Sequence, residues 1–261
     1  MLLARVVTAA VLLAAFVAAL FLLPRSWWAI LVGLILFAAG WEWARLCRLG
    51  AIPAGFYAAG VAALFGLGYL LNEEVRRAAF VVATLFWAAV APLWLARGVR
   101  SRHRPALIAA GVVVLVPAGI ALAVLEAKQV LFALVLVWIA DTGAYFSGRK
   151  WGRRKLAPAI SPGKTWEGVW GGVAGATAYA IIIGYFHSGP GTAWLVDSVV
   201  IAVVLTGISI VGDLFESGAK RQAEVKDSGA LLPGHGGVLD RIDSASAVLP
   251  LAALLVTLPK P

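Results

Sequence analysis

The sequence predicts an all-α integral membrane protein with about nine transmembrane helices. Of the 261 residues, 62% are hydrophobic and 13% are charged, and mean hydropathy is +0.92. Soluble domains contain only about 45–50% apolar residues. The apolar residues also gather in runs of the length that crosses a bilayer, about 20 residues. We therefore expect a multi-pass protein rather than a soluble domain.

Nine apolar runs, each bounded by charged or turn-forming residues, predict the spans. They cover about 4–23, 27–46, 52–71, 77–97, 106–125, 128–146, 167–187, 193–214 and 245–259. The first run exceeds the ~7–15 apolar residues of a signal peptide, and a second run follows at once, so we predict a retained helix. The ninth run is short and gives the weakest signal.

The distribution of basic residues predicts the orientation, because lysines and arginines in short loops collect on the cytoplasmic side. Of the 22 lysines and arginines, sixteen lie in the loops after spans two, four, six and eight, and four lie in the other loops. The N-terminus is therefore expected in the cytoplasm and the C-terminus outside. The basic cluster at 97–104 needs no other explanation than topology and attraction to anionic lipid.

Polar residues with catalytic potential gather in two segments, 138–172 and 211–243, which are predicted to share the cytoplasmic side. We accordingly divide the chain into N-terminal helices, 1–126, and a C-terminal catalytic region, 127–261, with cytoplasmic loops at 147–166 and 215–244. Asp141 and Asp213 follow long apolar runs at the ends of spans six and eight. Ionisable groups at that depth are functional candidates by default, although a helix cap or an internal ion pair is the alternative for each.

The second segment has the composition of a site for phosphate-rich anions. Its carboxylates are hard oxygen ligands that suit Mg²⁺, completed by waters and substrate phosphates. Lysines and arginines lie among them. The carboxylates are Asp213, Glu216, Asp227, Asp240 and Asp243, and the cations are Lys220, Arg221, Lys226 and Arg241. Asp240 or Asp243 could instead only cap span nine. The one cysteine, Cys47, excludes an intramolecular disulfide and a cysteine metal site.

Glycines and a predicted turn complete the pattern. Gly236 and Gly237 allow backbone N–H groups to approach an anion closely, although the P-loop spacing is not met. In ISPGKTWEG, Pro162 and Gly163 predict a turn that presents Lys164 and Thr165 to phosphate oxygens, with Glu167 as a cap for span seven. The basic run 149–155 fits a solvated inside-positive cluster equally well. We expect His235 to contact phosphate or support structure, because a phosphate monoester needs no general base to attack.

These motifs resemble the signature of the phosphatidate cytidylyltransferases, also called CDP-diglyceride synthases. The likeness is carried by SGAKRQAEVKDSGALLPGHGGVLDRID at 217–243, and extends to DTGAYFSG and SPGKTWEG. The resemblance implies a multi-span enzyme of the inner membrane, with its active site facing the cytoplasm. Such an enzyme transfers CMP from CTP to phosphatidic acid, releases pyrophosphate and requires Mg²⁺; the sequence leaves room for a second cation.

Carried onto this chain, the resemblance implies the following roles. Catalysis falls to Asp213, Asp240, Asp243, Lys220 and Arg221, with Asp213 and Asp240 as metal ligands. Substrate contacts fall to Ser217, Lys226, Asp227, His235, Gly236, Gly237, Arg241, Lys164, Thr165 and Asp141. The partners are CTP, phosphatidic acid and membrane lipids, with no nucleic acid. A homodimer is expected only by analogy with the family.

Three alternatives accompany this interpretation. An ion-coupled transporter would place its carboxylates near the bilayer midplane and show repeated halves, neither of which the sequence indicates. A CDP-alcohol phosphotransferase would carry a D-x-x-D-G-x-x-A-R motif, which is missing. A cytidylyltransferase for another lipid phosphate has the same requirements and stays open.

Overall fold

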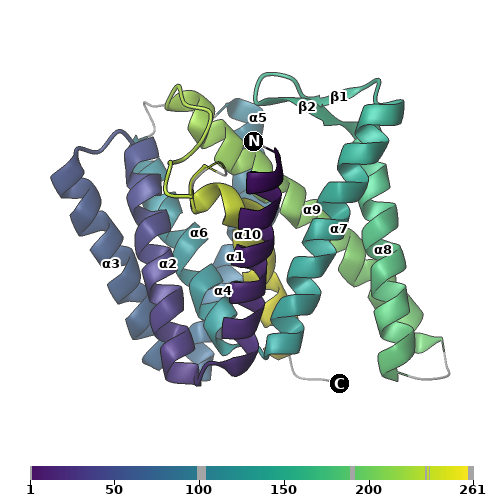
Figure 1. The fold of residues 1–261 in the computed structure, drawn as a ribbon, viewed down its shortest axis with the longest axis horizontal. Helices are drawn as coiled ribbons and strands as arrows, with labels where there is room; N and C mark the ends of the chain where they lie inside the picture. The colour runs from purple at the N-terminus through teal and green to yellow at the C-terminus, as the bar shows by residue number, and fades with distance from the viewer. Residues whose placement is uncertain (1, 99–103, 189–191, 233, 235, 258–261) are drawn as a thin grey trace.

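A computed structural model describes residues 2–98, 104–188, 192–232, 234 and 236–257. The helices are α1 (Leu2–Leu22), α2 (Arg25–Leu46), α3 (Ala51–Leu70), α4 (Glu73–Leu85), the π-helix η1 (Phe86–Val90), α5 (Ala91–Arg97), α6 (Arg104–Val124), α7 (Ala127–Trp151), α8 (Trp166–Ser188), α9 (Ala193–Gln222) and α10 (Leu239–Thr257). Two short strands, β1 (Lys155–Ala157) and β2 (Ser161–Thr165), lie between α7 and α8. The helices stand side by side, with the strands at one end of the bundle (Figure 1).

Each predicted span falls on a helix, and the chain is a multi-pass membrane protein. Within the described residues, seven helices are long and apolar enough to cross a membrane: α2, α3, the continuous unit Glu73–Arg97, α6, α7, Trp166–His187 of α8 and Trp194–Gln222 of α9. The first predicted span offers only a shorter apolar helix, Val7–Leu22. The ninth, α10, begins with the charged Asp240, Arg241 and Asp243 and is not among the seven. The total of nine spans stays a prediction.

The fourth span changes its winding in the middle. It runs from α4 through the π-helical turn η1 into α5, with a proline in the first turn of α5. Proline has no N–H to donate and crowds the preceding turn, and a wider π turn is one way for a helix to absorb such a break. The span therefore stays continuous over 25 residues.

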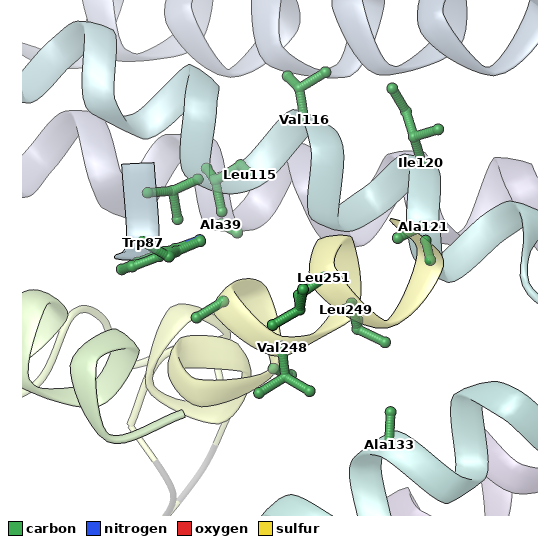
Figure 2. Packing of buried hydrophobic residues seen from close by; sticks show 14 of the residues in the cluster. Ala39, Trp87, Leu115, Val116, Ile120, Ala121, Ala133, Val248, Leu249 and Leu251 are labelled. Atoms are coloured by element: carbon green, nitrogen blue, oxygen red, sulfur yellow. The ribbon is translucent and has the colours of Figure 1, made fainter. Parts of the chain in front are cut away.

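The helix α10 lies at the centre of the bundle. Figure 2 shows Val248, Leu249 and Leu251 of α10 among side chains of neighbouring helices, including Leu115 of α6 and Ala133 of α7. Ten residues of α10 are buried, including Ser244 and Ser246. Because protein rather than lipid surrounds this helix, it does not need the uniform apolar surface of a lipid-facing span. This explains its weak hydropathy signal, and it places residues of the predicted C-terminal region against α4 and α6.

Glycines allow α7 and α8 to pack closely. A Cβ added at Gly143 would lie 2.8 Å from the carbonyl oxygen of Gly171, and one at Gly168 would lie 2.8 Å from that of Ala144. Small residues of this kind allow helix backbones to approach each other in membranes. The glycines of DTGAYFSG and of the segment after SPGKT therefore serve this seam between two helices.

The all-α prediction misses the small hairpin that joins α7 to α8. The strands β1 and β2 are antiparallel, with Lys155 opposite Thr165 and Ala157 opposite Ser161. The predicted turn at Pro162 and Gly163 is wrong, because these residues lie inside β2 and the turn falls at 158–160. The predicted loop 147–166 is also shorter in the structure, since α7 continues to Trp151.

Helix ends far apart in sequence meet at the end of the bundle that carries the hairpin. At the end of α2, Arg48 donates to the carbonyl of Gln222 at 3.2 Å and pairs with Glu224 at 2.8 Å. Gln222 in turn donates to the carbonyl of Leu46, and Arg104 at the start of α6 donates to the carbonyl of Arg48. The described parts of the basic loops after spans two, four and eight therefore lie on one side of the molecule.

Candidate active site

The end of α9 supplies several of the predicted site residues from one helix. The predicted loop 215–244 is shorter in the structure, because α9 continues to Gln222 and α10 begins at Leu239. Asp213, Ser217 and Lys220 follow one another at intervals of four and three residues, which places them along one helix face. A helix can carry charged residues at these intervals. The search for apolar runs therefore ended the helix too early, before Ser217 and Lys220. Asp213 lies nine residues before the end of α9, about 14 Å along its axis.

Asp213 pairs with a lysine from the hairpin. Its Oδ2 atom lies 2.5 Å from Nζ of Lys164 on β2, and its Oδ1 atom accepts a hydrogen bond of 3.2 Å from the hydroxyl of Ser217. The side chains of Asp213 and Lys164 are 27% and 26% exposed. The hairpin therefore brings a cation from the first polar segment onto a carboxylate of the second. Solvent and ligands can reach this pair.

Lys220 makes a second and deeper ion pair. Its Nζ atom lies 2.7 Å from Oδ1 of Asp240 at the start of α10 and 3.2 Å from Oε1 of Glu216. The side chains of Lys220, Asp240 and Glu216 are 12%, 5% and 4% exposed. Lys220 forms the ion pair that the structure gives to Glu216, and the Glu216 side chain also lies against the carboxyl group of Asp243. The group joins the last turn of α9 to the first turn of α10.

The other oxygen of Asp240 organises the loop 223–238. Its Oδ2 atom accepts hydrogen bonds from the backbone N–H of Ser228 at 2.9 Å, from the Ser228 hydroxyl at 3.0 Å and from the N–H of Gly237 at 2.8 Å. Burial disfavours the charged form, but the hydrogen bonds from Lys220, Gly237 and Ser228 outweigh it and hold the pKa of Asp240 below its usual value. Asp240 is thus ionised and engaged at both oxygens.

The glycines of the GHGG motif fit tightly around this carboxylate. Gly236 has a φ of +82°, which favours glycine, and a Cβ there would lie 2.8 Å from Oδ2 of Asp240. A Cβ at Gly237 would collide with the hydroxyl of Ser228. The carbonyl of Gly236 accepts the N–H of Leu232 at 2.9 Å. These contacts give both glycines a packing role around carboxylates of the protein.

Three further carboxylates approach one another beside Asp240. Asp141 on α7 lies close enough to Asp213 and Asp243 for their negative charges to repel, and Asp243 is in turn repelled by Asp213. Asp141 lies ten residues before the end of α7, about 15 Å along the axis, and is therefore deeper in the helix than the prediction placed it. Repulsion of this kind favours a bound cation; in the described part of the chain Lys164 pairs with Asp213, and Lys220 also attracts Asp243.

This donor set fits Mg²⁺ with substrate present. In the searched, described residues no three His, Cys, Asp or Glu side chains converge to hold a metal alone. Mg²⁺ does not require such a cage, because it is commonly held by one or two carboxylates, waters and phosphates. The predicted ligand pair is divided between different partners, Asp213 with Lys164 and Asp240 with Lys220. Asp213 has two contacts, from Lys164 and Ser217, whereas Asp240 has four, and Asp213 also has Asp243 and Asp141 nearby. Asp213 is therefore the better candidate ligand.

The remaining predicted residues lie around these two ion pairs. Arg221 donates to the carbonyl of Ile160 at 3.2 Å and so ties α9 to the hairpin. The side chains of Lys226, Asp227 and Arg241 are exposed, and among the residues that the structure describes none pairs with them. His235 lies outside the described residues. The exposed cations are thus available for an anion that enters from solvent.

Thr165 and Glu167 have structural partners in the hairpin region. The Thr165 hydroxyl accepts the N–H of Gly168 at 3.1 Å and so caps α8, the role that the sequence suggested for Glu167. Glu167 instead accepts hydrogen bonds from the backbone N–H groups of Arg153 and Arg154 at 3.0 and 3.2 Å. These bonds fix the exit from α7, and with it the position of Lys164.

Sequence analysis missed Glu42, a buried carboxylate on α2. Its side chain contacts the loop 223–238 and the start of α10. It accepts hydrogen bonds from the Ser228 hydroxyl and from the N–H groups of Val238 and Leu239. Glu42 is the one acidic residue in the second apolar run, WWAILVGLILFAAGWEWARL. A carboxylate inside an apolar span is costly without partners, and this signal could have identified it.

Comparison with known proteins agrees with this chemistry. The cytidylyltransferase family model matches residues 3–258. A phosphatidate cytidylyltransferase of Pseudomonas aeruginosa is 40% identical over 97% of this chain and 96% of its own length, and one of Haemophilus influenzae is 35% identical over 94% and 95%. A phosphatidate cytidylyltransferase of Brucella suis is 49% identical over 48% of the chain and 44% of its own length. The chain therefore belongs to the cytidylyltransferase family and is a nucleotidyltransferase.

Proposed function

We propose that this enzyme transfers CMP from CTP to phosphatidic acid, giving CDP-diacylglycerol and pyrophosphate, and that it requires Mg²⁺. The observation that carries the proposal is the meeting of Lys164, Asp213, Lys220 and Asp240 at one end of a membrane bundle. Paired lysines and carboxylates suit a reaction between two anions. The two long relatives, which carry the name phosphatidate cytidylyltransferase, support the choice of substrates.

The residues of the chain contribute position and charge. An oxygen of the lipid phosphate attacks the α-phosphorus of CTP in line, the bond to the β-phosphate oxygen breaks, and pyrophosphate leaves. In this proposal Lys164 and the exposed Arg241 and Lys226 contact phosphate oxygens, and Lys220 holds Asp240 charged and oriented. Positioning and electrostatic stabilisation carry most of such a reaction. When bound, Mg²⁺ would supply charge neutralisation on the phosphates, with Asp213 as the main carboxylate ligand.

The location of the site suits these two substrates. CTP is dissolved in the cytosol, whereas a lipid phosphate lies at the membrane interface with its acyl chains in the bilayer. The ion pairs lie at the end of the bundle where Arg48 contacts Gln222 and Arg221 contacts the hairpin. We propose that this end faces the cytoplasm across the inner membrane, in agreement with the excess of basic residues in its loops.

The test is an assay with purified protein, radiolabelled CTP, phosphatidic acid and Mg²⁺. We expect a labelled CDP-lipid and one equivalent of pyrophosphate. Lipid phosphates with other backbones, tested in parallel, separate phosphatidic acid from the alternative substrates. The absence of labelled lipid with every phosphate acceptor, in protein that elutes as a single folded species, would overturn the proposal.

A further inference from the structure

Glu42 brings a carboxylate from the N-terminal half of the chain under the loop 223–238. The residue lies near the end of α2 and is 5% exposed. Neither its distance from the signature in sequence nor its apolar surroundings mark it as part of the site. Its contacts do so, because every hydrogen bond that the structure gives to its two oxygens comes from residues 228–239.

The first contact is with the start of α10. Oε1 accepts the N–H of Val238 at 3.0 Å, and Oε2 accepts the N–H of Leu239 at 2.8 Å. The first N–H groups of a helix have no partner within it, and negative charge there is favourable. Glu42 therefore satisfies the beginning of α10 from a different helix. This fixes where the helix starts, one residue before Asp240.

The second contact links Glu42 to Asp240 through Ser228. The Ser228 hydroxyl lies 3.0 Å from Oε2 of Glu42 and 3.0 Å from Oδ2 of Asp240, while the Ser228 N–H also donates to Asp240. A hydroxyl has a single proton, so the two carboxylates share one donor. The arrangement couples the position of Asp240 to that of Glu42.

The loop is shaped to fit this carboxylate. A Cβ at Gly229 or at Gly237 would collide with the Glu42 side chain. Gly229 follows the donor Ser228 and Gly237 precedes the donor Val238, so the loop closes on the buried acid where its residues lack a side chain. The conformation of the loop therefore depends on glycine at the two positions where Glu42 of α2 approaches its backbone.

We propose that Glu42 is a positioning residue for the cytidylyl transfer: through Ser228 and the first N–H groups of α10 it holds Asp240, Lys220 and the loop 223–238 in the reactive arrangement. The inference rests on the proposed function. The described contacts of Glu42 are with Ser228 and the N–H groups of Val238 and Leu239, so we expect its loss to act mainly on the rate and less on substrate affinity. A misplacement of about 1 Å at a reacting group costs on the order of 10²-fold in rate.

The experiment compares Glu42→Gln with Glu224→Gln in the full-length enzyme. Both changes remove one carboxylate that joins the end of α2 to the segment after α9, but within the described residues the Glu224 side chain pairs with the exposed Arg48 alone. For Glu42→Gln we expect kcat to fall about 10- to 100-fold, with the KM values for CTP and lipid within about threefold. For Glu224→Gln we expect wild-type kinetics.

A second readout does not depend on activity. Hydrogen exchange by mass spectrometry should show faster deuteration of 223–241 in Glu42→Gln, and unchanged rates in α7 and α8. Ser228→Ala keeps the bonds from Glu42 to α10 but removes the shared hydroxyl, and we expect a kcat reduction of about five- to 20-fold. The double variant should fall no more than about threefold below the slower single variant, because both act through one contact.

Three results would overturn the inference. One is folded Glu42→Gln with faster exchange at 223–241 but wild-type kcat, which would make Glu42 structural only. Another is a multiplicative loss in the double variant. If Glu42→Gln does not fold, Ser228→Ala decides, and wild-type kcat in that variant would contradict the coupling. If the wild-type enzyme forms no CDP-lipid, the proposed function fails, whereas the exchange measurement still reports whether Glu42 holds the loop.

Discussion

The two lysine–aspartate pairs of the site differ in depth and in the number of their partners. Lys164 and Asp213 are each about one quarter exposed, and Asp213 has one other described donor, Ser217. Lys220 and Asp240 are nearly buried, and Asp240 accepts three further hydrogen bonds from the loop that follows α9. Ligands can replace the partner of an exposed pair, whereas a saturated buried pair costs too much to open. We therefore regard Asp213 as the working carboxylate and Asp240 as the one that holds the site together.

Asp213→Asn tests the working role and should have the largest effect. Loss of this charge removes the main candidate ligand for Mg²⁺ and the partner of Lys164, so we expect turnover to fall by about 10³-fold or more. The unfolding temperature should change little, because the pair is partly exposed. Asp197→Asn on the same helix, far from the site, is the control and should keep full activity. Substantial turnover in Asp213→Asn would contradict the assignment of Asp213 as the working carboxylate.

Asp240→Asn should differ from Asp213→Asn in its effect on stability. The change leaves the ammonium of Lys220 buried beside Glu216 alone, and breaking a buried pair costs about 3–5 kcal/mol. We expect activity to fall strongly and the unfolding temperature in detergent to fall as well. Equal stability of Asp240→Asn and wild type, measured by intrinsic fluorescence on heating, would contradict the scaffold role.

Lys164→Gln should have an intermediate effect. Charge-assisted hydrogen bonds to an anion contribute about 1.5–3 kcal/mol, so kcat/KM for CTP should fall about 10- to 100-fold. Lys155→Gln is the matched control, because Lys155 lies on the neighbouring strand and is exposed. Steady-state kinetics of the two variants measure this difference. An equal loss of kcat/KM in both would indicate a general effect of hairpin charge and contradict a specific role of Lys164.

Cysteine labelling tests on which side of the membrane the loop 223–238 and the start of α4 lie. The substitutions themselves should leave activity unchanged. Burial, offset in part by Arg104, raises the pKa of the Cys47 thiol to about 12, so the native enzyme should not react with maleimide. Ala230→Cys is exposed in the loop 223–238 and should react only from the cytoplasmic side. Glu74→Cys, at the start of α4, should react only from the outside. The reverse pattern would contradict the orientation.

The sequence predicted the helices well because each apolar run has the length of a membrane span. It failed at their ends. Asp213, Ser217 and Lys220 continue α9 as a polar face, and a search for apolar residues stops before them. The same search gave only a weak signal for α10, because this helix contains serines and charged residues. They are tolerated there because protein and not lipid surrounds the helix. The hairpin was missed because its strands are short.

The site was predicted in composition but not in pairing. Motif spacing identified the residues that meet, among them Asp213, Lys220 and Asp240. Which lysine faces which aspartate depends on how β2 and α10 pack, and no local pattern encodes it. Glu42 was missed because a single acid in an apolar run carries no spacing signal, and its partners lie almost 200 residues further along the chain.

The central position of α10 also constrains how the protein is made. Asp240 and the loop that holds it follow α9 in the chain, yet their partners on α2 and α9 are synthesised earlier. Until α10 enters the space between α4, α6 and α7, Lys220 lacks Asp240 and Glu42 lacks the N–H groups of Val238 and Leu239. Insertion of this helix is thus the step that closes the bundle and assembles the site together. A chain interrupted before α10 would have a membrane anchor and no working enzyme.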